Sequence, residues 1–123
     1  MTTSDDVTTA VRRYLAEVAS GTGSSIAALY AAEATVEDPV GSDPHRGVEA
    51  IAAFYAAIEQ TERSTELLTI RVAGASVAFH FRVTTTVGDR TVVVEPIDVM
   101  TFDAELKITS MRAFWSQADM VVG

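Results

Sequence analysis

The hydrophobic pattern of this chain changes its period part-way along, and that change limits the folds open to it. Up to about residue 64, apolar residues recur every three or four positions, as on helices that bury one face. Beyond that point apolar and polar residues alternate, as in half-buried strands. Helices followed by strands within 123 residues predict a single α+β domain spanning residues 1–123.

Three helices are predicted in the first half. The first is capped by Ser4, ends before Gly21 and buries a stripe that includes Tyr14. A short second helix, capped by Ser24 or Ser25, carries Tyr30. After a short extended piece at residues 35–38 and a loop at residues 39–47, the third helix carries five apolar residues on one side: Val48, Ile51, Phe54, Tyr55 and Ile58.

Strands are predicted near residues 67–72 and 77–83, and over residues 91–102 and 107–117. The turns between them fall at residues 87–90 and 103–106. Short connections between long strands indicate an antiparallel meander. We therefore expect three helices on the concave side of a curved antiparallel sheet, which leaves a cone-shaped pocket.

Composition excludes several classes of partner and chemistry. The net charge of −8 and the single lysine disfavour nucleic acid and anionic membrane surfaces as partners. The chain has no cysteine, its two histidines lie far apart, and no apolar run is long enough to span a membrane. We expect a soluble cytoplasmic protein. The hydrophobic share of 48% suggests a lined cavity or a buried subunit interface.

Asp98 is the most informative single residue. It shares strand parity with Val92, Val94, Met100 and Phe102, so its carboxyl group would face apolar neighbours on both sides. Burial there would favour the neutral acid, because desolvation penalises the charge. The alternative is that Asp98 lies at a strand bend, on the open face of the sheet or beside an arginine.

Asp38 stands between Glu37 and Pro39 at the edge of an element. A carboxylate in that place can be a mobile general base at the rim of a pocket. It can equally be an ordinary Asp-Pro turn residue. Glu37 alternates to the opposite face, where we expect it to be solvated.

Tyr14, Tyr30 and Tyr55 lie on the apolar sides of the three predicted helices. Buried tyrosines usually satisfy their hydroxyl groups, so the three can converge in one network or remain separate core aromatics with backbone partners. We expect His45 to be solvated in its loop, and His80 to face solvent or a partner subunit.

Seven large apolar residues are either core or the lining of a flat hydrophobic ligand: Phe54, Phe79, Phe81, Met100, Met111, Phe114 and Trp115. The sequence shows no phosphate loop, dinucleotide fingerprint, nucleophile elbow or metal motif.

Four segments together resemble the Δ5-3-ketosteroid isomerases of the nuclear-transport-factor-2-like superfamily. They are ATVEDPVGS at residues 34–42, AAFY at 52–55, PIDVM at 96–100 and ITSMRAFW at 108–115. The resemblance runs over nearly the whole chain. It implies a cone-shaped α+β fold, conversion of Δ5- to Δ4-3-ketosteroids without a cofactor or metal, and a homodimer formed through the outer sheet face.

The resemblance also implies roles for individual residues. Asp38 would be the general base, and Tyr14 with protonated Asp98 would bind the oxyanion of a dienolate. Tyr55 and Tyr30 would support Tyr14. The resemblance also implies a set of steroid-binding residues, which includes these two supporting tyrosines: Tyr30, Phe54, Tyr55, Phe79, Phe81, Met100, Met111 and Trp115. A base that both removes and returns one proton is expected to be exposed, with an ordinary carboxyl pKa.

Two other functions fit the same sequence. One is another enzyme of the superfamily, such as a polyketide cyclase, a dehydratase or an epoxide hydrolase, with different polar residues in the cone. The other is a non-catalytic dimer that binds an apolar ligand, in which Asp38 would be only a turn residue. The chain departs from its relatives at Leu106, where they carry glycine, and this puts the type of the last hairpin turn in question.

Overall fold

The computed structural model describes residues 2–123, and its first element is the helix α1, Ser4–Ser20. Five residues of α1 form its buried stripe: Val7, Val11, Tyr14, Leu15 and Val18. The predicted N-cap, Ser4, is wrong by one residue, because Thr3 caps the helix in a reciprocal capping box with Asp6. The stripe holds Tyr14 against the interior of the protein.

The helices α2, Gly23–Ala27, and α3, Val48–Ala56, follow. Thr22, rather than either predicted serine, caps α2. Tyr30 was predicted on this second helix, and that is wrong: it is the first residue of strand β1, Tyr30–Glu37. The helix stops after five residues because the chain at Tyr30 pairs with Ile108 in the sheet.

The other strands in the described residues are β2 His45–Arg46, β3 Glu62–Ala73, β4 Ser76–Val87, β5 Arg90–Val94, β6 Ile97–Phe102, β7 Ile108–Phe114 and β8 Met120–Val122, with a short 3-10 helix at Gln117–Asp119. They form one sheet in the order β2-β1-β7-β6-β4-β5-β8, and β3 pairs with β4. Both predicted hairpin turns are confirmed, at residues 87–90 and 103–106. Leu106 takes the left-handed conformation, with φ of 63°, in the second turn.

The sheet is mixed, and the prediction of a purely antiparallel one is wrong. β1 runs parallel to β7, with Glu37 beside Arg112, whereas the later strands form the predicted antiparallel meander. The alternation pattern shows that a segment is extended but not which distant strand it joins. Parallel pairing places the C-terminal ends of β1 and β7 side by side.

The strand predicted over residues 91–102 is two strands, β5 and β6, separated by Glu95 and Pro96. Proline has no N–H to donate, so the ladder against β4 is interrupted there. Both strands nevertheless keep one register along β4, through the pairs Val83–Val94 and His80–Ile97.

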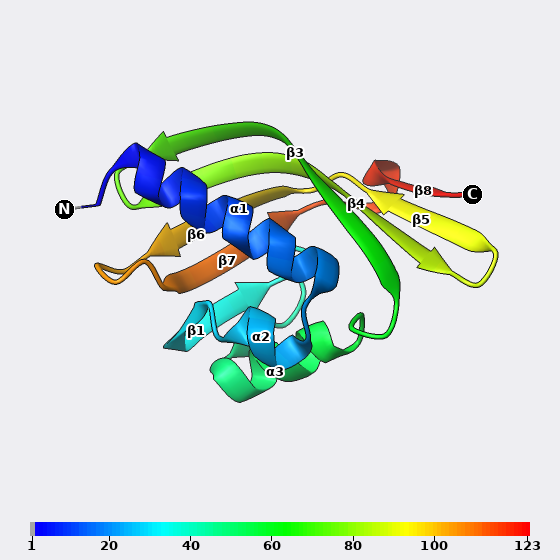
Figure 1. The fold of residues 1–123 in the computed structure, drawn as a ribbon, viewed down its shortest axis with the longest axis horizontal. Coiled ribbons are helices and arrows are strands. Elements are labelled where there is room, and N and C mark those ends of the chain that lie inside the picture. The colour runs from blue at the N-terminus through cyan, green and yellow to red at the C-terminus, as the bar shows by residue number, and fades with distance from the viewer. Residues whose placement is uncertain (1) are drawn as a thin grey trace.

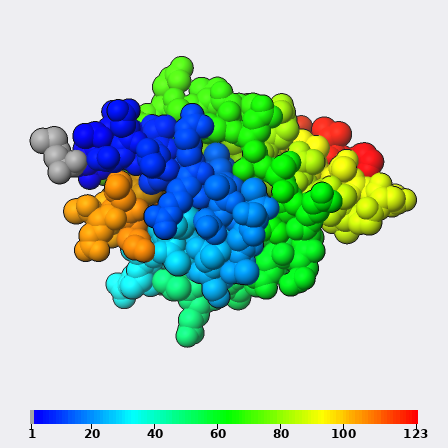
Figure 2. Space-filling model, viewed as in Figure 1, coloured from blue at the N-terminus to red at the C-terminus, as the bar shows by residue number. Residues whose placement is uncertain are grey.

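The helices cover one face of the curved sheet, and α1 crosses it diagonally against β3 (Figure 1). The space-filling view shows α1 and α2 over the middle of this face, with the turn between β6 and β7 beside the first turns of α1 (Figure 2). The core lies between these layers, and the predicted α+β cone is confirmed. Within residues 2–123, none of the helices has the length and apolar character to cross a membrane.

Candidate active site

A cavity of about 300 Å³ lies between the helices and the sheet. Tyr14 of α1, Asp38 after β1 and Asp98 of β6 all line it, so the structure brings together the three polar residues singled out from the sequence. The rest of the lining is almost wholly apolar: Val18, Phe54, Tyr55, Ala57, Ile58, Phe81, Val83, Val94, Pro96 and Trp115. A second cavity, of about 310 Å³ near the start of α1, contains none of the predicted site residues.

Asp98 is placed in the cavity by simple strand alternation. Along β6, Asp98, Met100 and Phe102 are buried, and the residues between them are more exposed. Asp98 is 1% exposed, and neither carboxyl oxygen has a hydrogen-bond partner among residues 2–123. Burial raises its pKa well above the ordinary value, and the negative charge of Asp38 raises it further. The apolar-row interpretation is therefore correct, and burial favours the neutral form of Asp98.

The three tyrosines form one network, although they come from different elements. The hydroxyl oxygens of Tyr14 and Tyr55 are 2.8 Å apart, and those of Tyr30 and Tyr55 are 2.7 Å apart. Desolvation by burial raises the pKa of all three phenols well above the usual value. Three hydroxyl groups share two hydrogen bonds, so one phenolic proton is left over. It lies on Tyr14 when Tyr30 donates to Tyr55 and Tyr55 donates to Tyr14.

Asp38 is positioned by the parallel pairing of β1 and β7. It follows the last residue of β1, and Trp115 follows the last residue of β7. The indole Nε1–H of Trp115 donates a hydrogen bond of 2.6 Å to Oδ1 of Asp38. Asp38 is half-buried, and burial raises its pKa while the Trp115 hydrogen bond lowers it in part. The prediction that Asp38 is exposed and has an ordinary carboxyl pKa is therefore wrong.

His45 does not lie free in its loop, so that prediction is wrong as well. Its ring packs on Phe54 with centroids 4.6 Å apart, and its backbone pairs with Val36 of β1. A positive charge on His45 lowers the pKa of Asp38. Glu37, expected to be solvated, instead binds Arg112 at 3.0 Å and accepts a hydrogen bond from the Gly41 N–H.

The residues expected to bind a substrate fall into two groups. Phe54, Tyr55, Phe81 and Trp115 line the cavity. The others, Tyr30, Phe79, Met100 and Met111, are buried and do not line it. Phe79 supports the site from behind, with its ring edge to face against Tyr14 at 6.4 Å.

Six lining residues were missed by the sequence analysis: Val18, Ala57, Ile58, Val83, Val94 and Pro96. Strand alternation contained a signal for two of these residues: Val94 shares strand parity with Asp98, and Val83 shares it with Phe81. In the described part of the chain, no group of His, Cys, Asp or Glu side chains is arranged to hold a metal ion.

Residues 11–111 match the family of SnoaL-like domains. The chain belongs to the SnoaL-like family. The resemblance to steroid Δ-isomerases is confirmed by the Steroid Delta-isomerase of Nocardioides simplex, which is 59% identical over 119 residues, 97% of each chain. That match covers Tyr14, Asp38 and Asp98 within its length.

Solved structures of two proteins share the fold over 100% of both chains, each with a TM-score of 0.89. One is the epoxide hydrolase/cyclase-like enzyme SalBIII, described with a role in pyran ring formation in the polyether salinomycin, at 28% identity. The other is RV0760c from Mycobacterium tuberculosis, at 21% identity, and it bears on the fold alone. The SnoaL-like fold thus carries more than one chemistry, and the polar residues in the cavity must decide between them.

Proposed function

We propose that this protein is a steroid Δ-isomerase that converts Δ5-3-ketosteroids into Δ4-3-ketosteroids. The observation that carries the proposal is the buried Asp98, with two unpartnered carboxyl oxygens, in the same cavity as Asp38. Burial disfavours the charged form of Asp98, whereas Asp38 is half-buried and accepts a hydrogen bond from Trp115 that favours its charged form. Two carboxyl groups in different environments suit a reaction that needs one acid and one base.

Asp38 acts as the base in this proposal. Its carboxylate removes a proton from the carbon between the ketone and the double bond, and the electron pair of that C–H bond enters a dienolate. The carboxyl group then delivers the same proton two carbons further along, which gives the conjugated enone and regenerates the carboxylate. A position at the cavity wall, held by a single side-chain hydrogen bond from Trp115, suits a base that serves both carbons.

Tyr14 and Asp98 bind the oxygen of the dienolate. Asp98 donates the proton of its neutral carboxyl group, and Tyr14 donates its phenolic proton. Tyr14 is free to do so when Tyr55 donates to Tyr14 and Tyr30 donates to Tyr55, a direction compatible with the two observed distances. Donors fixed in an apolar cavity stabilise a developing charge without reorganisation.

The test is turnover of a Δ5-3-ketosteroid by the wild-type protein, followed by the ultraviolet absorbance of the conjugated enone. Isomerisation with saturation in substrate is the expected result. The similarity to SalBIII gives a second candidate, opening of an epoxide by a hydroxyl group or water. An epoxide substrate therefore belongs in the same assay, and epoxide opening without isomerisation would contradict the proposal. Binding of the steroid with no turnover of either substrate would indicate a binding protein.

We also propose that the protein is a homodimer formed through the outer face of the sheet. Ile97 and Phe114 lie opposite each other there, at 47% and 43% exposure, which is high for large apolar side chains in one cross-strand pair. The mass in solution tests this proposal. Ile97→Asp is expected to give a monomer, and a wild-type protein that is monomeric at micromolar concentration would contradict the proposal.

A further inference from the structure

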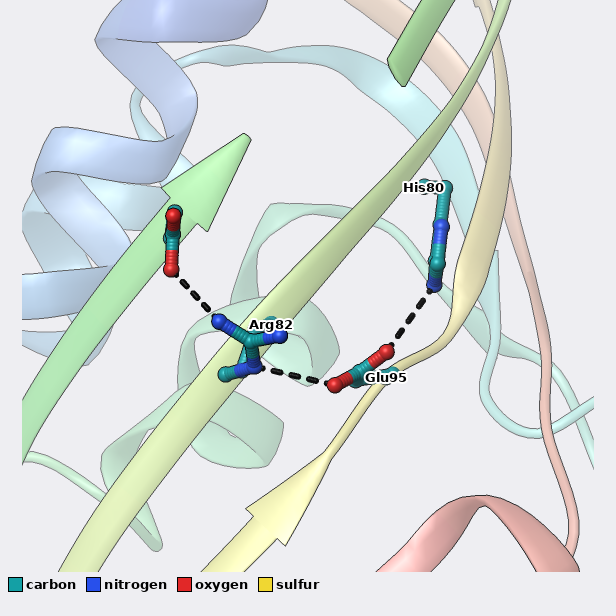
Figure 3. Close-up of polar contacts among 4 residues, drawn as sticks. His80, Arg82 and Glu95 are labelled. Atoms are coloured by element: carbon teal, nitrogen blue, oxygen red, sulfur yellow. Dashed lines mark hydrogen bonds and ion pairs between the residues drawn. The ribbon is translucent and has the colours of Figure 1, made fainter. Parts of the chain in front are cut away.

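A row of charged side chains crosses the outer face of the sheet. Arg82 of β4 lies opposite Glu66 of β3 and contacts its Oε1 through Nη1 at 2.6 Å. The Nε–H of Arg82 donates to Oε2 of Glu95 at 2.9 Å, and Nε2 of His80 lies 3.3 Å from Oε1 of the same carboxylate. Figure 3 shows Arg82 and His80 both directed at Glu95. Glu95 thus ties two residues of β4 to the segment between β5 and β6.

This contact lies where the backbone ladder along β4 is interrupted. The flanking pairs Val83–Val94 and His80–Ile97 set Arg82 opposite Glu95, and Phe81 opposite Pro96. The Phe81 N–H donates to the Pro96 carbonyl at 3.3 Å, but Pro96 has no N–H to return the bond. A charge-assisted side-chain bond between Arg82 and Glu95 therefore supports the junction of β5 and β6 beside the missing backbone bond.

The inner face of the same segment is a wall of the cavity. Phe81 and Val83, which flank Arg82, line the cavity, and so do Val94 and Pro96, which flank Glu95. Each residue of the charged pair is thus held between two residues of the wall. Any shift of the junction moves four lining side chains at once.

The wall runs away from the proposed oxyanion site. Asp98, Pro96 and Val94 occupy alternate positions, and the four steps from residue 98 to residue 94 span roughly 13 Å at about 3.3 Å per residue. Such a length exceeds one six-membered ring and suits a rigid polycyclic substrate. The reacting ring would lie by Asp98, and the rings beyond it would lie along Val94.

We propose that Arg82 and Glu95 are positioning residues for this wall, and that they set how tightly the cavity holds the substrate beyond its reacting ring. The inference rests on the proposed isomerase function. Without the pair, the junction has fewer constraints and the distant rings lose their fixed contact. Within one subunit the side chains of both residues are more than a third exposed, so the effect is modest, roughly two- to fivefold in KM.

The test compares two substrates in the variants Arg82→Met and Glu95→Gln. One is a tetracyclic Δ5-3-ketosteroid, and the other is a single-ring β,γ-unsaturated cyclohexenone that extends no further than the reacting ring. We expect KM for the steroid to rise with kcat within about twofold, and kcat/KM for the cyclohexenone to stay within about twofold. The double variant should lose about as much as either single variant, because both remove the same contact.

Arg71→Met is the matched control, since Arg71 is an exposed arginine of β3 that bonds only to the neighbouring Ile70 carbonyl among the described residues. It should leave both substrates unchanged. Should Arg82→Met fail to fold, Arg82→Lys keeps the positive charge, and we expect a smaller loss on the steroid alone. Equal losses on both substrates, an unchanged steroid KM, or the same loss in Arg71→Met would overturn the inference. A wild-type protein inactive on both substrates would instead contradict the proposed function itself, and this inference would fail with it.

Discussion

Trp115 and Asp38 are joined by a hydrogen bond of 2.6 Å, from the indole Nε1–H to Oδ1, although 77 positions separate them in the sequence. Each lies one residue beyond the end of a strand, and the two strands run parallel. The bond stabilises the ionised carboxylate and so opposes the effect of burial on the pKa of Asp38. It also fixes the direction of the proposed base.

Replacing Trp115 with Phe keeps a large apolar side chain and removes the donor. The pKa of Asp38 should rise, because the group that favours its charged form is lost. The acid limb of kcat/KM should therefore move to higher pH, so the loss should be small above both limbs and grow to roughly tenfold as the pH falls below them. A pH–rate profile measures this shift. A limb that moves to lower pH, or does not move, would contradict the role of this bond.

The tyrosine network predicts a graded series of activity losses. Tyr14→Phe removes a proposed oxyanion donor and should cost about 10²–10³-fold in kcat. Tyr55→Phe removes the hydroxyl that bonds Tyr14 and should cost roughly three- to tenfold, and Tyr30→Phe less than that. Steady-state rates of the three variants give the order. A larger loss for Tyr30→Phe than for Tyr14→Phe would contradict the direction of the relay.

Asp98 should contribute to activity through its proton rather than through a charge. Asp98→Ala should lower kcat by about 10²–10³-fold. Asp98→Asn should retain more activity, since the amide can donate to the same oxyanion without being ionised. Comparing the rates of the two variants on one steroid shows whether residue 98 acts as a proton donor. An Asn variant weaker than the Ala variant would indicate that the wild-type residue acts as a carboxylate.

The raised pKa of Asp98 also predicts how stability depends on pH. In the folded protein Asp98 holds its proton above the pH at which it ionises in the unfolded chain. Between these two pKa values the folded state binds more protons, so the free energy of unfolding falls as pH rises, by up to about 1.4 kcal/mol per pH unit from this residue. Asp98→Asn removes that contribution.

Denaturant unfolding of wild type and Asp98→Asn across the range from about pH 4 to pH 8 measures the difference. The variant should gain stability relative to wild type as pH rises. Asp89→Asn, in the exposed turn between β4 and β5, is the control and should follow the wild-type curve. A constant difference between wild type and Asp98→Asn would show that Asp98 ionises alike in both states.

Local patterns in the sequence predict much of the fold and two of the proposed catalytic residues. Strand parity placed Asp98 in an apolar row, and helical spacing placed Tyr14 on a buried stripe. Both are periodic signals within a single element, so they can be identified without knowing what the element packs against. The confirmed steroid Δ-isomerase resemblance rests on four segments, and one of them, residues 96–100, includes Asp98.

What the sequence analysis missed depends on contacts between distant elements. The parallel pairing of β1 with β7 has no local signal, and it controls both the place of Tyr30 and the meeting of Asp38 with Trp115. The raised pKa of Asp38 follows from the partial burial of its carboxyl group at the end of β1. Pro96 was visible in the sequence, but its effect on the ladder emerges only once β4 is known to be the neighbour.

The central claim is that Asp38 moves the proton, and Asp38→Asn tests it most directly. The measurement is the growth of enone absorbance from a Δ5-3-ketosteroid, with Asp43→Asn as the control because Asp43 is an exposed acid of the neighbouring loop. We predict a loss of at least about 10²–10⁴-fold in kcat for Asp38→Asn, with the steroid still bound, and near wild-type activity for Asp43→Asn. Near-full activity in a folded Asp38→Asn protein would contradict the account.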